Sequence, residues 1–106
     1  TASGAKAITG VGFKPSWAII IQAVDGTKMF SVGISHGTSH GAAYTQDGVS
    51  ADTWSYQNNK SFAAIIDNSN YCIGYVSSWD SDGATLTLAK TGSPTGTSYM
   101  TILFGR

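Results

Sequence analysis

Apolar residues are concentrated in one stretch near the start of the chain, residues 8–23, which reads ITGVGFKPSWAIIIQA. Its run of three isoleucines is too short to cross a bilayer, and β-branched side chains favour a strand over a helix. Because the run is apolar without alternation, we predict a strand that is buried on both faces. Pro15 suits the entry of this strand, since it has no N–H to donate to a neighbouring strand.

Alternation of apolar and polar residues predicts a hairpin partner for this strand. An Asp-Gly pair at residues 25–26 is a strong hairpin signal. Residues 28–35 then carry Phe30, Val32 and Ile34 on one face, between smaller or more polar neighbours. We expect that apolar face to be the buried one.

The middle of the chain is more polar and is rich in turn-forming residues. Residues 36–41 predict a loop, and residues 42–45 predict a brief strand. A further strand is expected within residues 49–56, followed by a turn at residues 57–60.

Four more strands are predicted in the second half of the chain, at residues 61–67, 71–79, 84–90 and 98–104. In the second of these, strict alternation places Trp79 on the same face as Tyr75 and opposite Val76. In the third, Leu86 and Leu88 alternate with threonines and are expected to be buried. A turn rich in Asp, Ser and Gly separates these two strands, which indicates a second hairpin.

The spacing of these elements predicts the fold class. About eight strands, spaced by about ten residues and without helical periodicity, are typical of an all-β, antiparallel β-sandwich of jelly-roll-like type. The length of 106 residues supports one modest core. We therefore predict a single domain over residues 1–106.

Charge is scarce in this chain. Charged residues make up 11% of the sequence, formal net charge is zero, and there is no glutamate, whereas soluble domains usually contain about 25%. Without a basic stripe we expect no nucleic-acid partner, and without a long apolar run we expect no membrane partner. A weakly charged surface favours a protein that works within an assembly. The single Cys72 excludes an intramolecular disulfide and leaves the redox compartment undetermined.

Two groups of residues partly match metal sites. His36 and His40 are four residues apart, as in zinc-binding pairs on helices, but glycine, threonine and serine separate them in a predicted loop. Asp80, Asp82 and Gly83 resemble the start of a calcium loop, yet no acidic residue closes the pattern. A polar loop and a turn explain both groups better, so we expect neither a metal nor another cofactor.

Catalytic patterns are also missing from the sequence. There is no Gly-x-Ser-x-Gly elbow, and nothing places a base against a serine. All six aspartates lie in or beside predicted turns, which does not favour a pair of catalytic carboxylates. We therefore expect a protein that is not an enzyme.

Aromatic residues in a polar setting are candidates for binding, either as interface anchors or as a surface that stacks on sugars. Most of them are expected in the core. Trp54 and Tyr56, which lie in the most polar strand, are the aromatic residues most expected to be exposed. Together with His36 and His40 they form the candidate surface for a partner or ligand.

Two stretches, GVGFKPSWAIII near the start and SSWDSDGATLTLAKTGSPTGTSYMTILFGR at the end, together resemble a known family. They are similar to the start and end of a jelly-roll-like domain of bacteriophage virion structural proteins, where a Gly-Phe-x-Pro entry accompanies a late Asp-Gly-x-Thr-Leu hairpin. This chain departs from the pattern at Ser16, where an aspartate is common. The motif residues here are Gly12, Phe13, Pro15, Asp82, Gly83, Leu86, Gly92, Pro94 and Gly96.

The resemblance implies that these residues have structural roles in turns and core, and that the protein is part of a virion. It would be a capsid decoration (cement) protein or a module of a tail or fibre, located on the capsid exterior or the tail. The small first residue, Thr1, is what removal of an initiator methionine leaves, which favours a complete short protein and hence decoration; a cleaved leader or an excised domain gives the same start. The expected partners are further copies of the chain, in a homotrimer, and a capsid or tail protein.

Two other functions remain open. One is a carbohydrate-binding or receptor-binding module of a tail fibre or lectin, in which Trp54 or Tyr56 contacts a glycan. The other is a subunit of a non-viral surface filament, joined through free sheet edges. In each case we expect residues 8–23 to be architectural. Function is then expected on the free sheet edges and on the loops at residues 36–41, 46–60 and 91–97.

Overall fold

The structure, a computed structural model, describes residues 3–26, 29–45, 54–67, 69–93 and 98–106, with backbone only at residues 54–55 and 66–67. The described residues form strands and turns and contain no helix, which confirms the all-β prediction. The nine strands are β1 (Gly4–Ile8), β2 (Trp17–Val24), β3 (Phe30–His36), β4 (Ser39–Thr45), β5 (Trp54–Asn58), β6 (Phe62–Asp67), β7 (Asn70–Asp80), β8 (Gly83–Thr91) and β9 (Ser98–Gly105).

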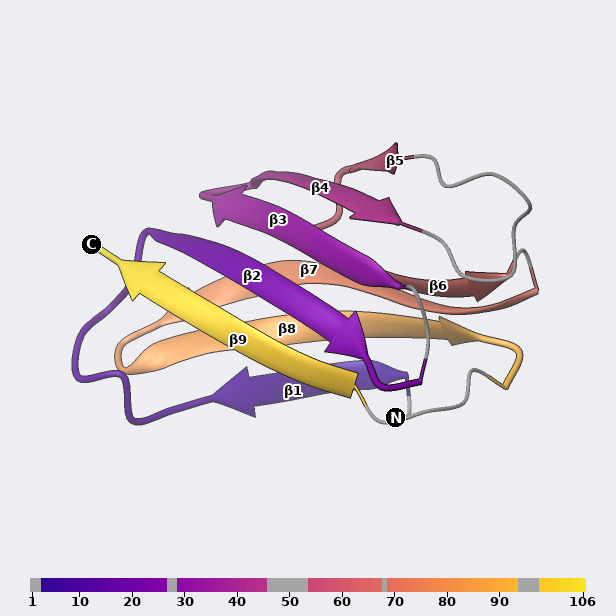
Figure 1. Cartoon of the computed structure of the whole chain (residues 1–106). Coiled ribbons are helices and arrows are strands. Elements are labelled where there is room, and N and C mark those ends of the chain that lie inside the picture. Colours follow the sequence, from indigo (N-terminus) through magenta and orange to yellow (C-terminus); the bar gives the residue numbers. More distant parts are fainter. Residues whose placement is uncertain (1–2, 27–28, 46–53, 68, 94–97) are drawn as a thin grey trace.

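The strands form two antiparallel sheets, as expected for a β-sandwich. One sheet has the order β1-β8-β7-β6, and the other has the order β5-β4-β3-β2-β9. Figure 1 shows the five-stranded sheet nearer the viewer, with the fainter β7 and β8 behind it. Strands β2 to β5 form one meander and β6 to β8 form another, so the chain changes sheet after β1, β5 and β8.

The core lies between the two sheets. Its main cluster of buried side chains comprises Ile20, Phe62, Val76, Ala84 and Leu86. Burying each large member contributes roughly 1.5–3 kcal/mol relative to leaving it exposed. Partly buried apolar residues extend this cluster: Ile8, Trp79, Leu88, Met100, Ile102 and Phe104.

Several element boundaries differ from the prediction. The expected loop at residues 36–41 is a tight turn between β3 and β4, in which Gly37 has a φ of 60°. β4 therefore begins at Ser39 and is longer than the brief strand predicted. β5 continues into the expected turn, as far as Asn58, while residues 49–53 lie outside the described residues.

The face of Trp79 was predicted wrongly. The register between β7 and β8 shifts between Val76 and Ser78, which is a bulge. The extra residue reverses the alternation beyond it. Trp79 therefore packs against the core on the side of Val76, and its Nε1 donates to the carbonyl oxygen of Gly37 at 3.0 Å.

The strand that holds the three isoleucines is buried on one face only, which corrects the prediction of two buried faces. Ile20, Gln22 and Val24 are buried between the sheets, whereas Ile19 and Ile21 lie on the outer side and are partly exposed. A sheet in a two-layer sandwich has one interior side. The apolar outer side of β2 is therefore a surface of this chain.

The buried face of β3 was also predicted wrongly. Ser31 and Ser35 are fully buried, whereas Val32 and Ile34 are 38% and 51% exposed. The alternation itself was correct, because Phe30 lies on the same side as these two residues. What differs is which side of the strand faces the core.

Close approach of the two sheets explains this inversion. A Cβ atom added at Gly33 would overlap the carbonyl oxygen of Ser61, just before β6. Beside this contact, the backbone N–H of Ala63 donates to Oγ of Ser31 at 3.4 Å. Only small side chains fit where the backbones approach this closely, so β3 turns its serines and glycine inward.

The two stretches that carry the family resemblance are in direct contact. The carboxylate of Asp82, in the turn before β8, accepts hydrogen bonds from the backbone N–H groups of Gly10 at 3.0 Å and Gly12 at 2.7 Å. Both glycines have positive φ values, 83° and 90°, a region that glycine enters without steric cost. Asp82 therefore fixes the loop that leads into β2.

The other motif residues also have structural surroundings where they are described. Pro15 is fully buried, and the ring of Phe13 lies 5.0 Å from the guanidinium of Arg106. A side chain at Gly83 would overlap the carbonyl oxygen of Ile8. At Gly92, φ is 69°. Pro94 and Gly96 lie outside the described residues.

Candidate interaction face

The outward side of the five-stranded sheet, here called the outer face, is the main candidate for function. Strand register aligns its side chains in rows across the sheet. One row contains Leu103, Ile19, Ile34, Gly41 and Asn58. The adjacent row contains Thr101, Ile21, Val32, Ala43 and Tyr56. Each row thus presents several apolar side chains side by side.

Large apolar side chains that are exposed occur only on the outer face within the described part of the chain. They are Val32 (38% exposed), Ile34 (51%), Tyr56 (67%), Tyr99 (62%) and Leu103 (51%). Single exposed apolar residues are normal on proteins, but a contiguous group marks a contact surface.

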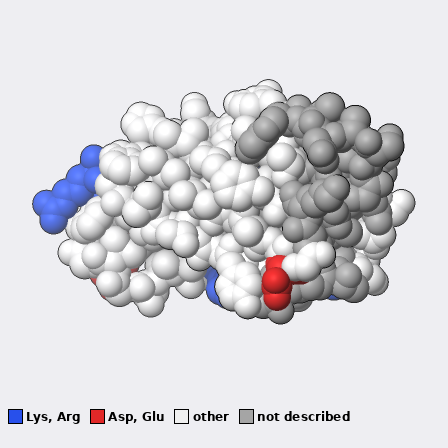
Figure 2. Space-filling view, in the orientation of Figure 1, with Lys and Arg blue, Asp and Glu red and all other residues white. Residues whose placement is uncertain are grey.

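Charged residues are segregated between the two sheets. The five strands of the larger sheet contain no Lys, Arg, Asp or Glu. The other sheet carries charged residues in every strand, namely Lys6, Asp67, Asp80 and Lys90. Figure 2 shows the outer face as white atoms over its described part, with blue and red atoms only towards the margins. The outer face therefore pays little desolvation cost when another surface covers it.

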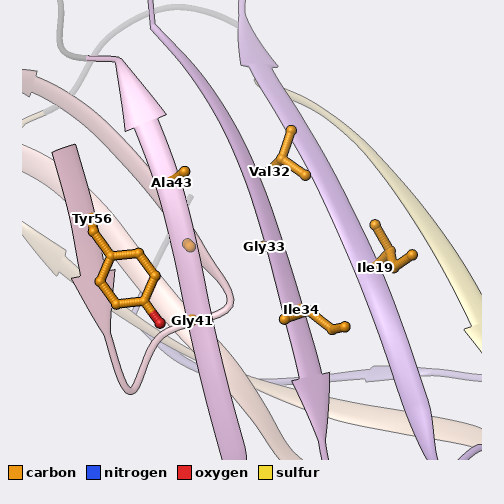
Figure 3. A pocket seen from close by; sticks show the side chains of 8 residues that line it. Ile19, Val32, Gly33, Ile34, Gly41, Ala43 and Tyr56 are labelled. Atoms are coloured by element: carbon orange, nitrogen blue, oxygen red, sulfur yellow. The ribbon is translucent and has the colours of Figure 1, made fainter. Parts of the chain in front are cut away.

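A hollow of about 350 Å³ lies on the outer face across β2 to β5. Its floor is the backbone of Gly33, Gly41 and Ala42, and the aliphatic side chains of the outer face form one wall. Tyr56 forms the opposite wall. Figure 3 shows its ring extending from β5 toward β4, with the hydroxyl directed toward Gly41. A side chain at Gly41 would overlap that hydroxyl, so glycine at this position is what lets Tyr56 lie flat.

The four candidate residues from the sequence do not form one site. Tyr56 is exposed, as expected, and lines the hollow. The side chain of Trp54 lies outside the described residues; its backbone pairs with that of Thr45 in β4. His36 is exposed at the end of β3 on the outer side, whereas His40 pairs with the buried Ser35 and faces the interior. The two histidines thus lie on opposite faces of the sheet.

His40 belongs to a small polar cluster at one end of the sandwich. Its Nδ1 lies 2.8 Å from Oγ of Ser35, its ring centroid is 5.2 Å from that of Tyr75, and Nζ of Lys60 is 5.5 Å from the same tyrosine ring. Burial and, secondarily, the positive charge of Lys60 lower the pKa of His40. Ser35 is fully buried, so its hydroxyl is not accessible from solvent.

The aspartates that resembled a calcium loop are held by other partners. Asp80 accepts hydrogen bonds from the hydroxyls of Ser78 at 2.9 Å and Thr85 at 2.8 Å. Asp82 accepts hydrogen bonds from the backbone N–H groups of Gly10 and Gly12. Within the described ranges, no group of three or more His, Cys, Asp or Glu side chains is arranged to hold a metal. In the same ranges, no helix is long and apolar enough to span a membrane.

Most of the outer face is not evident from the sequence. Ile34, Leu103 and Tyr99 lie in predicted strands, and the local pattern does not mark them as surface residues. A signal was present, because the strands that form the larger sheet lack charge altogether. The lack of charge points to one surface only once strand pairing shows that these five strands belong to the same sheet.

The chain was compared with protein-family models, with curated proteins and with solved structures. No match is found in any of the three comparisons.

Proposed function

We propose that this chain is a non-enzymatic structural protein of a virion that works by packing its outer face against other protein subunits. The observation that supports this proposal is the outer face itself: five exposed large apolar side chains on a sheet without charged residues. Selection for solubility alone would place charged residues on such a sheet. Coverage by protein explains both features together.

The virion assignment rests on the motif resemblance. The two motif stretches occur together for a physical reason, because Asp82 in the second stretch hydrogen-bonds to the backbone of Gly10 and Gly12 at the first. Within the virion, decoration of the capsid remains the first proposal and a tail or fibre module the second. The homotrimer expected from the resemblance is not tested by the structure, and the inference below replaces it with a dimer.

A carbohydrate-binding module is less well supported by the hollow. Sugar sites combine an aromatic ring with several polar groups that bind hydroxyls. Tyr56 supplies an exposed ring, but the other lining residues are aliphatic residues, alanines and glycines. Such a lining suits an apolar side chain of a protein better than a glycan.

Incorporation into particles tests the proposal. Particles purified by density gradient from a culture that carries the gene are expected to contain the chain, as measured by peptide mass spectrometry. Because an apolar contact does not depend on ion pairs, the chain should stay bound in about 1 M salt, where the Debye length is about 3 Å.

A matched pair of variants identifies the surface used. Leu103→Glu adds a charge to the outer face, and Ala89→Glu adds the same charge to the exposed outward side of β8 in the other sheet. We expect the first variant, folded by circular dichroism, to be lost from particles and the second to be retained. A wild-type chain that is found only free of particles would contradict the proposed function.

A further inference from the structure

We infer that the outer face binds a second copy of this chain, with Leu103 of each copy seated in the hollow of the other. This inference rests on the proposed function, because it names the partner of the same surface. The relevant features are the shape of the face, its lack of charge and its area.

Shape is the first argument, because the outer face carries both a projection and a matching depression. Leu103 projects from β9 at the edge of the sheet and is 51% exposed. The hollow extends from β2 to β5, and its open floor is the backbone of Gly33 and Ala42, because the hydroxyl of Tyr56 covers Gly41. Its volume of about 350 Å³ exceeds twice the roughly 150 Å³ of an apolar cavity that accepts benzene, so a leucine side chain fits.

Symmetry lets both depressions be filled at once. Register places Leu103, Ile19, Ile34 and Gly41 in one row on β9, β2, β3 and β4. A two-fold axis parallel to the strands, midway between β2 and β3, exchanges β2 with β3 and β9 with β4. Leu103 of each copy then lies over β4 of the other, at the row of Gly41, where the ring of Tyr56 borders the hollow, and Ile19 faces Ile34. Such a self-complementary contact is the isologous interface found in most dimers.

Charge is consistent with pairing of identical faces. Two copies of a charged surface repel each other, and like charges brought together are costly. The outer face has no charged residue in any of its five strands, so identical copies approach without this penalty. A partner of opposite charge has nothing to recognise on this face.

The area is sufficient for a specific contact. The two-fold pairs four strands of each copy, β9, β2, β3 and β4. At about 4.8 Å apart and about seven residues of 3.3 Å each, they cover roughly 450 Å² in projection. Side chains rise from this plane, so the accessible area is larger and reaches the roughly 500 Å² per partner that a specific interface needs. Two sheets stacked about 10 Å apart leave the space that these side chains fill.

Sedimentation equilibrium of the full chain over a range of concentrations gives the first test. Wild type is expected to reach a dimer of twice its 11.0 kDa mass. Leu103→Glu and Ala43→Lys each place a charge in the proposed contact, at the projection and in the hollow lining respectively, and each is expected to be monomeric. Ala89→Lys, on the other sheet, is expected to dimerise like wild type. Circular dichroism confirms that each variant is folded.

Mixing the two monomeric variants provides the decisive test. In a mixed pair, the new carboxylate of Leu103→Glu meets the new ammonium of Ala43→Lys at one contact, and the other contact has its original leucine and alanine. We therefore expect a one-to-one heterodimer. A mixture of Leu103→Lys with Ala43→Lys brings like charges together and is expected to stay monomeric.

Several results would overturn the inference. They are a wild type that is monomeric at all concentrations, a trimer in place of the dimer, a Leu103→Glu variant that still dimerises, or a mixture that does not pair. None of these depends on the particle experiment. A wild-type monomer that is nevertheless incorporated into particles would reject self-pairing and leave the proposed function standing.

Discussion

The inverted orientation of β3 leads to a quantitative prediction about two isoleucines. Ile20 is fully buried in the core, and Ile34 is 51% exposed on the outer face. Replacing Ile20 by alanine removes three buried carbons and leaves a cavity, which costs about 2–5 kcal/mol of unfolding free energy. At Ile34 about half of the side chain is already in water. With about 0.8 kcal/mol per buried carbon, Ile34→Ala is expected to cost about 1 kcal/mol without a cavity term.

Urea unfolding at high dilution measures these costs, because dilution keeps the chain monomeric. The midpoints should shift without a change in slope, as expected when stability alone is altered. At higher concentration, Ile34→Ala should lose additional stability, since association stabilises the folded state of wild type. Equal costs for Ile20→Ala and Ile34→Ala at high dilution would mean that Ile34 lies in the core.

Gly33→Ala provides an independent control on the same orientation. In this structure its new methyl group overlaps the carbonyl oxygen of Ser61, so the variant should be strongly destabilised. If β3 were slipped by one residue, position 33 would point outward. Alanine would then be tolerated, or stabilise the strand by roughly 0.5–1 kcal/mol. A stable Gly33→Ala protein would therefore refute the orientation described here.

Two further predictions concern the Asp82 carboxylate, which holds the loop at Gly10 and Gly12, and the partly buried His40. Asp82→Ala should cost about 1–2 kcal/mol of unfolding free energy, because the N–H groups of Gly10 and Gly12 that the carboxylate binds return to water. As a control, Asp25→Ala in the β2–β3 turn should change the urea midpoint little. Equal effects of the two variants would contradict the role of Asp82 in holding this loop. The lowered pKa of His40 means that the unfolded state binds its proton more readily, so stability should fall as pH decreases below 6.5, the ordinary histidine value. Urea midpoints measured between about pH 7.5 and 5.5 should decrease as the pH falls, both in wild type and in the control His36→Gln. The decrease should be smaller in His40→Gln. An equal decrease in His40→Gln would mean that another group causes the pH dependence of stability.

The fold class and most strand positions follow from the sequence. Alternation and turn residues located the two hairpins, and the core positions of Leu86 and Ile20 were expected from the pattern and are confirmed. The Asp-Gly turns succeeded because their geometry depends on adjacent residues. Tyr56 was also expected at the surface, since its strand is polar.

Local pattern does not determine which face of a strand is buried. A period of two tells which side chains share a side of β3, but the same pattern fits a core on either side. The close approach of Gly33 to the backbone of Ser61 decides the matter, and that contact joins residues far apart in sequence. The bulge that turns Trp79 inward is likewise a property of the pairing between β7 and β8.

The outer face also combines a property that the sequence predicts with one that depends on strand pairing. The sequence determined that charge is scarce, because that is a property of composition. Strand pairing in the folded chain brings the strands without charge into one sheet, and it places Ile34 and Leu103 in one row with Ile19 between them. The physical reason is that a sandwich buries one side of each sheet, and long-range contacts between the sheets select which side that is.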